Sequence, residues 1–158
     1  MIRQKRNSRL ELRNNLLLVV FLPIILPLLL VAVTLFFLYR TTLYLLVWTL
    51  WLPRGKDVLF VCSDSPIWGE HMASEILPLV QKRAVVLNWS QRKTWRKWSL
   101  PVRIFYHFGG DREFNPLVVL FRPARRAKVF RFWRAFKDWK HGRTEPVGLL
   151  VQNLRNAL

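Results

Sequence analysis

The chain has 158 residues, enough for one domain and one membrane-crossing segment. Lysine and arginine number 26 against 9 acidic residues, a formal net charge of +17, so the expected partners are anionic: lipid head groups, acidic proteins or nucleic acid. The single cysteine, Cys62, excludes a framework of disulfide bonds within the chain and favours a reducing compartment.

The N-terminal region reads as a basic tail followed by a membrane anchor. Residues 1–15 are polar and basic, whereas residues 16–38 carry no charge over the length that a helix needs to cross a bilayer, so we expect a transmembrane helix there. This stretch is too long for a cleaved signal peptide and no small-residue cleavage pattern follows it, which favours a signal anchor. Pro23 and Pro27 predict kinks, and a hairpin over residues 16–52 remains an alternative.

A second apolar stretch, residues 43–52, is too short to span a bilayer. Tyr44, Trp48 and Trp51 share one helical face, and tyrosine and tryptophan favour the head-group level of a membrane. We therefore expect this stretch to continue the anchor as an interfacial segment, with Arg40 reaching the same level.

A turn at Pro53 to Lys56 predicts the boundary of a separate basic domain, residues 54–158. Beyond it, short apolar runs alternate with amphipathic runs. Strands are predicted at 57–62, 83–88, 102–108 and 116–121. Helices are predicted from Ser65-Pro66 to about Pro78, at 91–98, at 127–140 and from Glu145 to about residue 157.

This order of elements predicts an α/β fold. We expect an N-terminal transmembrane helix followed by a small Rossmann-like, three-layer domain with a mostly parallel sheet of about four strands. The strands on either side of Gly109 are the pair for which an antiparallel arrangement is also expected, because a glycine turn separates them.

The loop after the first predicted strand is the best candidate for a ligand site. Ser63, Asp64 and Ser65 follow the strand that ends at Cys62, and ligands of open α/β sheets bind at the carboxyl ends of strands. Free N–H groups at the start of the following helix suit an anion, although ordinary capping by Ser65 explains the same residues. The sequence contains no glycine-rich phosphate loop.

Two resemblances concern this region. The strand VLFVC is similar to the first strand of low-molecular-weight protein tyrosine phosphatases, which ends in a nucleophilic cysteine, but Trp68 stands where that family needs an arginine. Cys62 is therefore expected to be a buried strand residue. The strand, the Ser/Asp loop and the amphipathic helix together also resemble a TIR-type domain, which implies by analogy of fold an enzyme or a nucleotide-binding domain.

The other polar residues form no catalytic or metal-binding pattern. His71, His107 and His141 lack the paired spacing of zinc ligands, and Glu70 and Glu75 share no face with another carboxylate. We therefore expect no metal and no cofactor, and we favour a protein without catalytic activity over an enzyme.

Two tracts combine basic and aromatic residues, which is typical of segments that lie on an anionic membrane surface. The predicted contacts to such a surface are Arg92, Lys93, Arg96, Lys97, Arg125, Arg126, Lys128, Arg131 and Arg134. The predicted function is that of an integral membrane protein whose basic domain binds anionic lipid or an acidic partner. A membrane-tethered enzyme or nucleotide-binding domain that uses residues 62–65 is the alternative. Nucleic acid is less expected, because no recognised nucleic-acid motif is present.

Charge alone does not decide on which side of the membrane the domain lies. Five basic residues precede the apolar run, and Arg40, Arg54 and Lys56 follow it. The free Cys62 and the attraction to anionic lipid of the inner leaflet favour a cytoplasmic domain. That placement requires either a hairpin or an anchor whose N-terminus lies outside.

Overall fold

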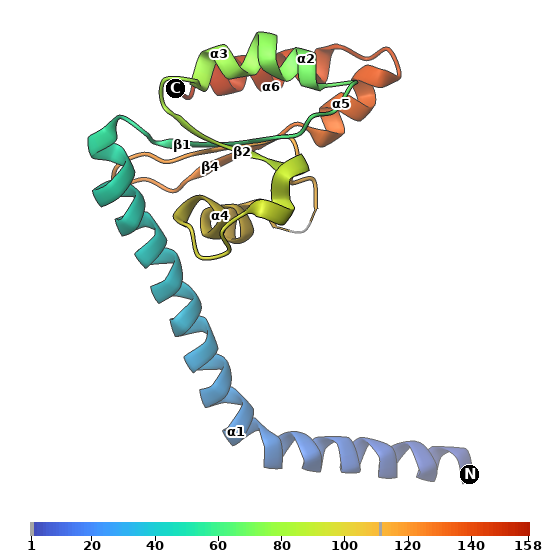
Figure 1. Cartoon of the computed structure of the whole chain (residues 1–158). Coiled ribbons are helices and arrows are strands. Elements are labelled where there is room, and N and C mark those ends of the chain that lie inside the picture. Colours follow the sequence, from blue (N-terminus) through green and yellow to red (C-terminus); the bar gives the residue numbers. More distant parts are fainter. Residues whose placement is uncertain (1, 111) are drawn as a thin grey trace. The chain divides into compact units, whose positions relative to one another are not determined.

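The computed structural model describes residues 2–110 and 112–158, with side chains described from Phe21 onward. The chain divides into two compact units, residues 1–41 and residues 42–158. Helix α1 (Ile2–Leu46) forms the first unit, and its last residues belong to the second (Figure 1).

Helix α1 runs without a reversal, so the hairpin alternative for residues 16–52 is wrong. Pro23 and Pro27 both lie inside the helix. The large apolar side chains between Phe21 and Leu38 are 44–68% exposed. An 18-residue window of this apolar region has a mean hydropathy of 2.8, and none of it is buried. By length and composition the helix is able to cross a membrane.

The second unit is built around a four-stranded sheet in the order β2-β1-β3-β4. Its strands are β1 (Val58–Cys62), β2 (Ala84–Asn88), β3 (Leu117–Leu120) and β4 (Lys128–Arg131). Strand β1 pairs in parallel with β2, and β3 is antiparallel to both of its neighbours, β1 and β4. Strands β1, β2 and β4 therefore run in one direction and β3 runs against them.

The prediction of a mostly parallel sheet is wrong, and one cause is that residues 102–108 are helical. They belong to α4 (Leu100–Ile104) and η5 (Phe105–Gly109). A proline in the first turn favours this helix start. Phe105 and Phe108 are buried at a helical spacing, whereas a half-buried strand requires a period of two. The connection after β2 is therefore helical at these residues. The next strand, β3, pairs with β1 in the antiparallel direction.

The second cause is that the predicted helix 127–140 is split into a strand and a helix. Residues Lys128–Arg131 form β4, and α5 (Trp133–Lys140) follows directly. A run rich in valine and phenylalanine suits a strand as well as a helix, and pairing with β3 decides for the strand. Only a short connection separates β3 from β4, which suits antiparallel neighbours.

One helical stretch joins β1 to β2. It consists of α2 (Gly69–His71), the π-helical turn η3 (Met72–Ile76) and α3 (Leu77–Val80). Pro78 lies near the start of α3 and does not end the stretch, contrary to the prediction. The wide turn before it accommodates a residue that has no N–H group.

The remaining helical segments lie after β2, after β4 and before β1. A 3-10 segment, η4 (Trp89–Thr94), replaces the predicted helix at 91–98. The last helix, α6 (Glu145–Arg155), confirms the prediction for the C-terminal region. Before β1, α1 passes into a π-helical turn, η1 (Val47–Trp51), and a 3-10 turn, η2 (Leu52–Arg54).

Both faces of the sheet are buried, with helical segments on each side (Figure 1). In β1, Val58 and Phe60 belong to one apolar cluster and Leu59 and Val61 to another, and all four are at most 1% exposed. The first core cluster includes residues of η3, α3, α5 and α6. The second core cluster includes residues of α4, η5, η1 and the end of α1.

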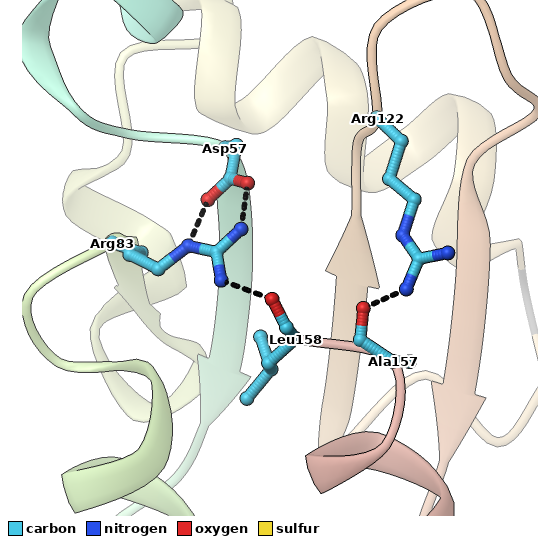
Figure 2. A network of polar contacts seen from close by, with 5 residues as sticks. All are labelled: Asp57, Arg83, Arg122, Ala157 and Leu158. Carbon is cyan, nitrogen blue, oxygen red and sulfur yellow. Dashed lines mark hydrogen bonds and ion pairs between the residues drawn. The ribbon is translucent and has the colours of Figure 1, made fainter.

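A polar network holds the residues after α6 against the sheet (Figure 2). The buried Asp57 forms an ion pair with Arg83, whose Nε donates to Oδ1 of Asp57 over 2.9 Å. Arg83 also donates to the main-chain carbonyl of Leu158 at 2.6 Å, and Arg122 donates to that of Ala157. The hydrogen bond to Asp57 raises the pKa of Arg83, which keeps its guanidinium charged.

Candidate functional site

The segment from η4 to η5 packs on the second core cluster and carries the first basic tract. Trp89 and Trp95 point inward, with ring centres 5.6 Å apart, and both rings approach that of Phe105, at 5.6 and 5.4 Å. The Trp95 Nε1 group donates to the main-chain carbonyl of Asn88 at 3.1 Å. These contacts fix the segment on the sheet.

The outward side chains of this segment are basic and aromatic. Trp98 is 81% exposed and Tyr106 is 62% exposed. The guanidinium of Arg103 lies 4.5 Å from the centre of the Trp98 ring, within cation–π range. The basic aromatic surface, as we name it, consists of Arg92, Lys93, Arg96, Lys97, Trp98, Arg103 and Tyr106.

The end of α1 packs on the same face of the sheet. Leu43, Val47 and Trp51 recur every four residues and are at most 6% exposed within the second core cluster. Ile104 and Phe105, from α4 and η5, belong to this cluster too. The first residues of the second unit therefore pack on the same face of the sheet as the segment that carries the basic aromatic surface.

The residues predicted for the membrane interface lie in both units. Arg40 is half-buried at the end of the first unit. In the second unit, the Tyr44 hydroxyl accepts a hydrogen bond from the amide of Ala127 at 2.8 Å, and the Tyr44 ring lies 6.0 Å from that of Trp48. Trp51 is a core residue. The stretch predicted as an interfacial continuation of the anchor thus packs as part of the domain, which begins at Thr42.

The second basic tract contains exposed and engaged side chains. Arg125, Arg126 and Lys128 are exposed. Arg131 is half-buried, and its guanidinium donates to main-chain carbonyls at the end of η5 and in the connection to β3, including those of Phe108 at 3.1 Å and Arg112 at 2.9 Å. Arg131 therefore serves the fold.

Arg134, the last predicted contact of this tract, forms an ion pair with Glu113 while 82% of its side chain is exposed. An ion pair at such a surface contributes little to stability, about 0–1 kcal/mol. Its charge is nevertheless partly compensated by Glu113, whereas Arg125 and Arg126, in the β3–β4 connection, form none of the ion pairs of the described residues.

The loop of Ser63, Asp64 and Ser65 lies at the carboxyl end of β1, beside β2, and its polar groups bind within the protein. The Asp64 amide donates to Oγ of Ser90 at 3.0 Å, and Nδ2 of Asn88 donates to Oδ1 of Asp64 at 2.8 Å. Oγ of Ser65 accepts from the amide of Ile67 at 3.3 Å, whereas helix α2 begins only at Gly69. Ser65 thus caps a turn before the helix.

Cys62, at the end of β1, is a free and half-buried thiol. Burial raises the pKa of this thiol, and the carboxylate of Asp64 raises it further. A thiol that stays protonated is a poor nucleophile, so the strand end offers no activated cysteine. Within residues 21–110 and 112–158, no three histidine, cysteine or acidic side chains gather as metal ligands would.

A cavity that the sequence analysis missed lies between the α2–η3 stretch, the end of α5 and one face of α6. Its volume is about 480 Å³. The residues important for its chemistry are His71, Glu75, Trp139, Gly148, Gln152 and Arg155. Those from α6 recur at spacings of three and four residues. In the sequence, the signal for this cavity is the helical face of small and polar residues that α6 presents.

Comparisons with models of known protein families, with curated proteins and with solved structures find no match to this chain. The basic aromatic surface and the cavity at α6 are therefore the features from which a function is inferred.

Proposed function

We propose that the chain is a single-span integral membrane protein whose α/β domain lies against anionic lipid through the basic aromatic surface. The exposed apolar stretch of α1 supports the membrane span, because side chains that are 44–68% exposed gain from contact with lipid. The fold behind the surface is mixed α/β; the helical segments on both faces of the sheet support a three-layer arrangement.

The single observation that carries the lipid contact is the exposure of Trp98. Its side chain is 81% exposed, although Trp89 and Trp95 of the same segment pack inward. A tryptophan at a lipid head-group level places its apolar ring toward the acyl chains and its N–H group toward water.

The charges around Trp98 supply the preference for anionic lipid. Arg92, Lys93, Arg96 and Lys97 are exposed. Each lysine or arginine near an anionic membrane contributes about 1 kcal/mol, so the four together contribute on the order of 4 kcal/mol. The covalent link to the span keeps the domain at a high local concentration near the bilayer.

We place the domain in the cytoplasm. Anionic lipids are concentrated in the cytoplasmic leaflet, and the free Cys62 suits a reducing compartment. With one span, this puts the N-terminal tail outside. Fusion of a reporter to the C-terminus tests the placement: green fluorescence without alkaline phosphatase activity is expected, and the opposite pattern would contradict it.

The lipid contact is tested with a fluorescent label beside Trp98 in the full chain. In a Cys62→Ser background, Lys97→Cys carries an environment-sensitive dye, and the protein is reconstituted in vesicles whose lipids have brominated acyl chains. We expect strong quenching in vesicles that contain phosphatidylserine and weaker quenching in phosphatidylcholine alone.

A label at Leu149→Cys is the matched control. Leu149 is 60% exposed on α6, a helix of the first core cluster and so of the other sheet face. Its label is expected to stay unquenched in both lipids. Equal quenching at both positions, or no effect of Trp98→Ala on the label at residue 97, would exclude the proposed contact.

A further inference from the structure

Gly148 lies in the interior of α6, where glycine is among the weakest helix formers. Nothing in the fold requires glycine at this position. The residue does not adopt the left-handed conformation, and a Cβ atom added to it would meet no atom within 4 Å. Because Gly148 has no side chain, space remains in the cavity that α6 forms with His71, Glu75 and Trp139.

Two opposite charges line this cavity. Glu75 and Arg155 are both exposed. In the part of the chain whose side chains are described, the ion pairs and side-chain hydrogen bonds involve other residues, so neither charge is compensated by a neighbour.

The cavity wall also includes His71. The His71 ring is held by aromatic contacts, 5.4 Å from the ring centre of Phe136 and 5.8 Å from that of Trp139. Its Nε2 atom is buried and does not open into the cavity, so His71 contributes a fixed part of the wall.

From the open cavity and its two opposite charges we propose that the cavity binds a small zwitterion, in which a primary ammonium lies close to a carboxylate or a phosphate. A simple anion would be repelled by Glu75, and a simple cation by Arg155. A zwitterion satisfies both: the ammonium pairs with Glu75 beside the face of Trp139, and the anionic group pairs with Arg155. The fixed rings of His71 and Trp139 belong to the wall of the site.

The size of the cavity limits the ligand. A volume of about 480 Å³ lies toward the small end of the range for ligand pockets, roughly 300–1,000 Å³. Val147 and Val151 line the wall and would contact an apolar part of the ligand. An amino acid or dipeptide in solution and the phosphoethanolamine head group of a lipid share this chemistry. The site does not depend on the proposed lipid contact of Trp98.

Thermal unfolding of the full chain in maltoside micelles tests the site. The probes are the standard L-amino acids, glycyl dipeptides and glycerophosphoethanolamine. We expect at least one to raise Tm, while its N-acetylated or amidated derivative, or glycerophosphocholine for the lipid-derived probe, binds at least tenfold more weakly. The probe that acts identifies the source: an amino acid or dipeptide from solution, or a lipid head group.

Gly148→Leu is the decisive variant, because its side chain fills the cavity and leucine is a good helix former. We expect its Tm without probe to equal or exceed that of the original chain, and its response to the probe to be lost. Gly148→Ala, which adds one methyl group, should keep the response. Should Gly148→Leu fail to fold, the exposed positions Glu75→Gln and Arg155→Gln serve instead, each with affinity at least tenfold lower.

Three results would overturn the proposal. The first is that no probe raises Tm. The second is that the increase persists in Gly148→Leu, or in Glu75→Gln and Arg155→Gln. The third is that derivatives with only one charge bind as tightly as the zwitterion.

Discussion

The two basic tracts of this protein have similar compositions and different roles. In the first tract, Arg96 and Lys97 extend from a segment that Trp89 and Trp95 fix on the core. In the second tract, Arg131 turns back to the protein and donates to main-chain carbonyls of a neighbouring connection. A basic and aromatic composition therefore predicts a charged surface only where no unpaired carbonyls lie within reach.

The difference follows from the needs of irregular backbone. The connection between η5 and β3 has no strand to pair with, so its carbonyls need other donors. A guanidinium offers five N–H donors in a fixed plane, and Arg131 can bind several of these carbonyls at once. A lysine ammonium, such as that of Lys97, has neither the reach nor the shape for this task.

The largest expected effect comes from Arg131→Ala. Because hydrogen bonds to a charged group contribute about 1.5–3 kcal/mol, and several carbonyls would lose their donor, we expect the free energy of unfolding to fall by about 3 kcal/mol. Urea unfolding of the full chain in micelles, followed by tryptophan fluorescence, measures it. Arg126→Ala is the control, with a change within about 0.5 kcal/mol. Equal effects would remove the distinction between engaged and exposed arginines.

Asp57→Ala extends the comparison to a second engaged arginine. Its partner Arg83 is 39% exposed, so solvent weakens the pair, and we expect a loss of about 2 kcal/mol in the free energy of unfolding. The double variant Asp57→Ala with Arg83→Ala should lose less than the sum of the single variants, because the two side chains act together. Additive losses would show that the pair is not coupled.

The exposed tract should behave in the opposite way. Replacing Arg92 and Lys93 together by glutamine should leave the free energy of unfolding within about 0.5 kcal/mol of the original. The same change should weaken the lipid contact by about 2 kcal/mol, since each charge contributes about 1 kcal/mol. Quenching of the label at residue 97 reports the contact. Replacing Arg125 and Arg126, which belong to the second basic tract, is expected to have little effect on that label.

Salt has the smallest expected effect on the free energy of unfolding, and it acts selectively on the lipid contact. Raising the ionic strength to about 1 M shortens the screening length to about 3 Å, so quenching of the label in anionic vesicles should fall toward its value in neutral lipid. The difference in unfolding free energy between the original chain and Arg131→Ala should stay nearly unchanged, because half-buried hydrogen bonds are screened much less. A salt-insensitive label would mean that charge does not hold the surface at the bilayer.

The elements that the sequence predicted correctly share one property: local signals define them. Strands β1, β2 and β3 are short apolar runs bounded by turn residues, and α6 begins with a proline in its first turn. The incorrect predictions that changed the sheet fall at 102–108 and 127–140, where short runs rich in valine and phenylalanine suit both a strand and a helix. Pairing with β3 and packing under the sheet decided between them.

The candidate site was predictable in part. The position of Ser63, Asp64 and Ser65 at a strand end followed from the order of elements, but their hydrogen bonds with Asn88 and Ser90 depend on the neighbouring strand. The sequence also indicated the basic residues, but it did not distinguish the exposed side chains from those that bind other groups of the protein. The cavity at α6 was missed because it joins residues from three segments that are distant along the chain.

Composition and periodicity over a few residues were enough to predict the long apolar N-terminal helix, the excess of positive charge and the α/β character of the second unit. These properties depend on residues that are close along the chain. The direction of β3, the inward turn of Arg131 and the cavity at Gly148 depend instead on tertiary contacts. Each of these arises where backbone or side chains from distant parts of the chain compete for the same partner or the same space.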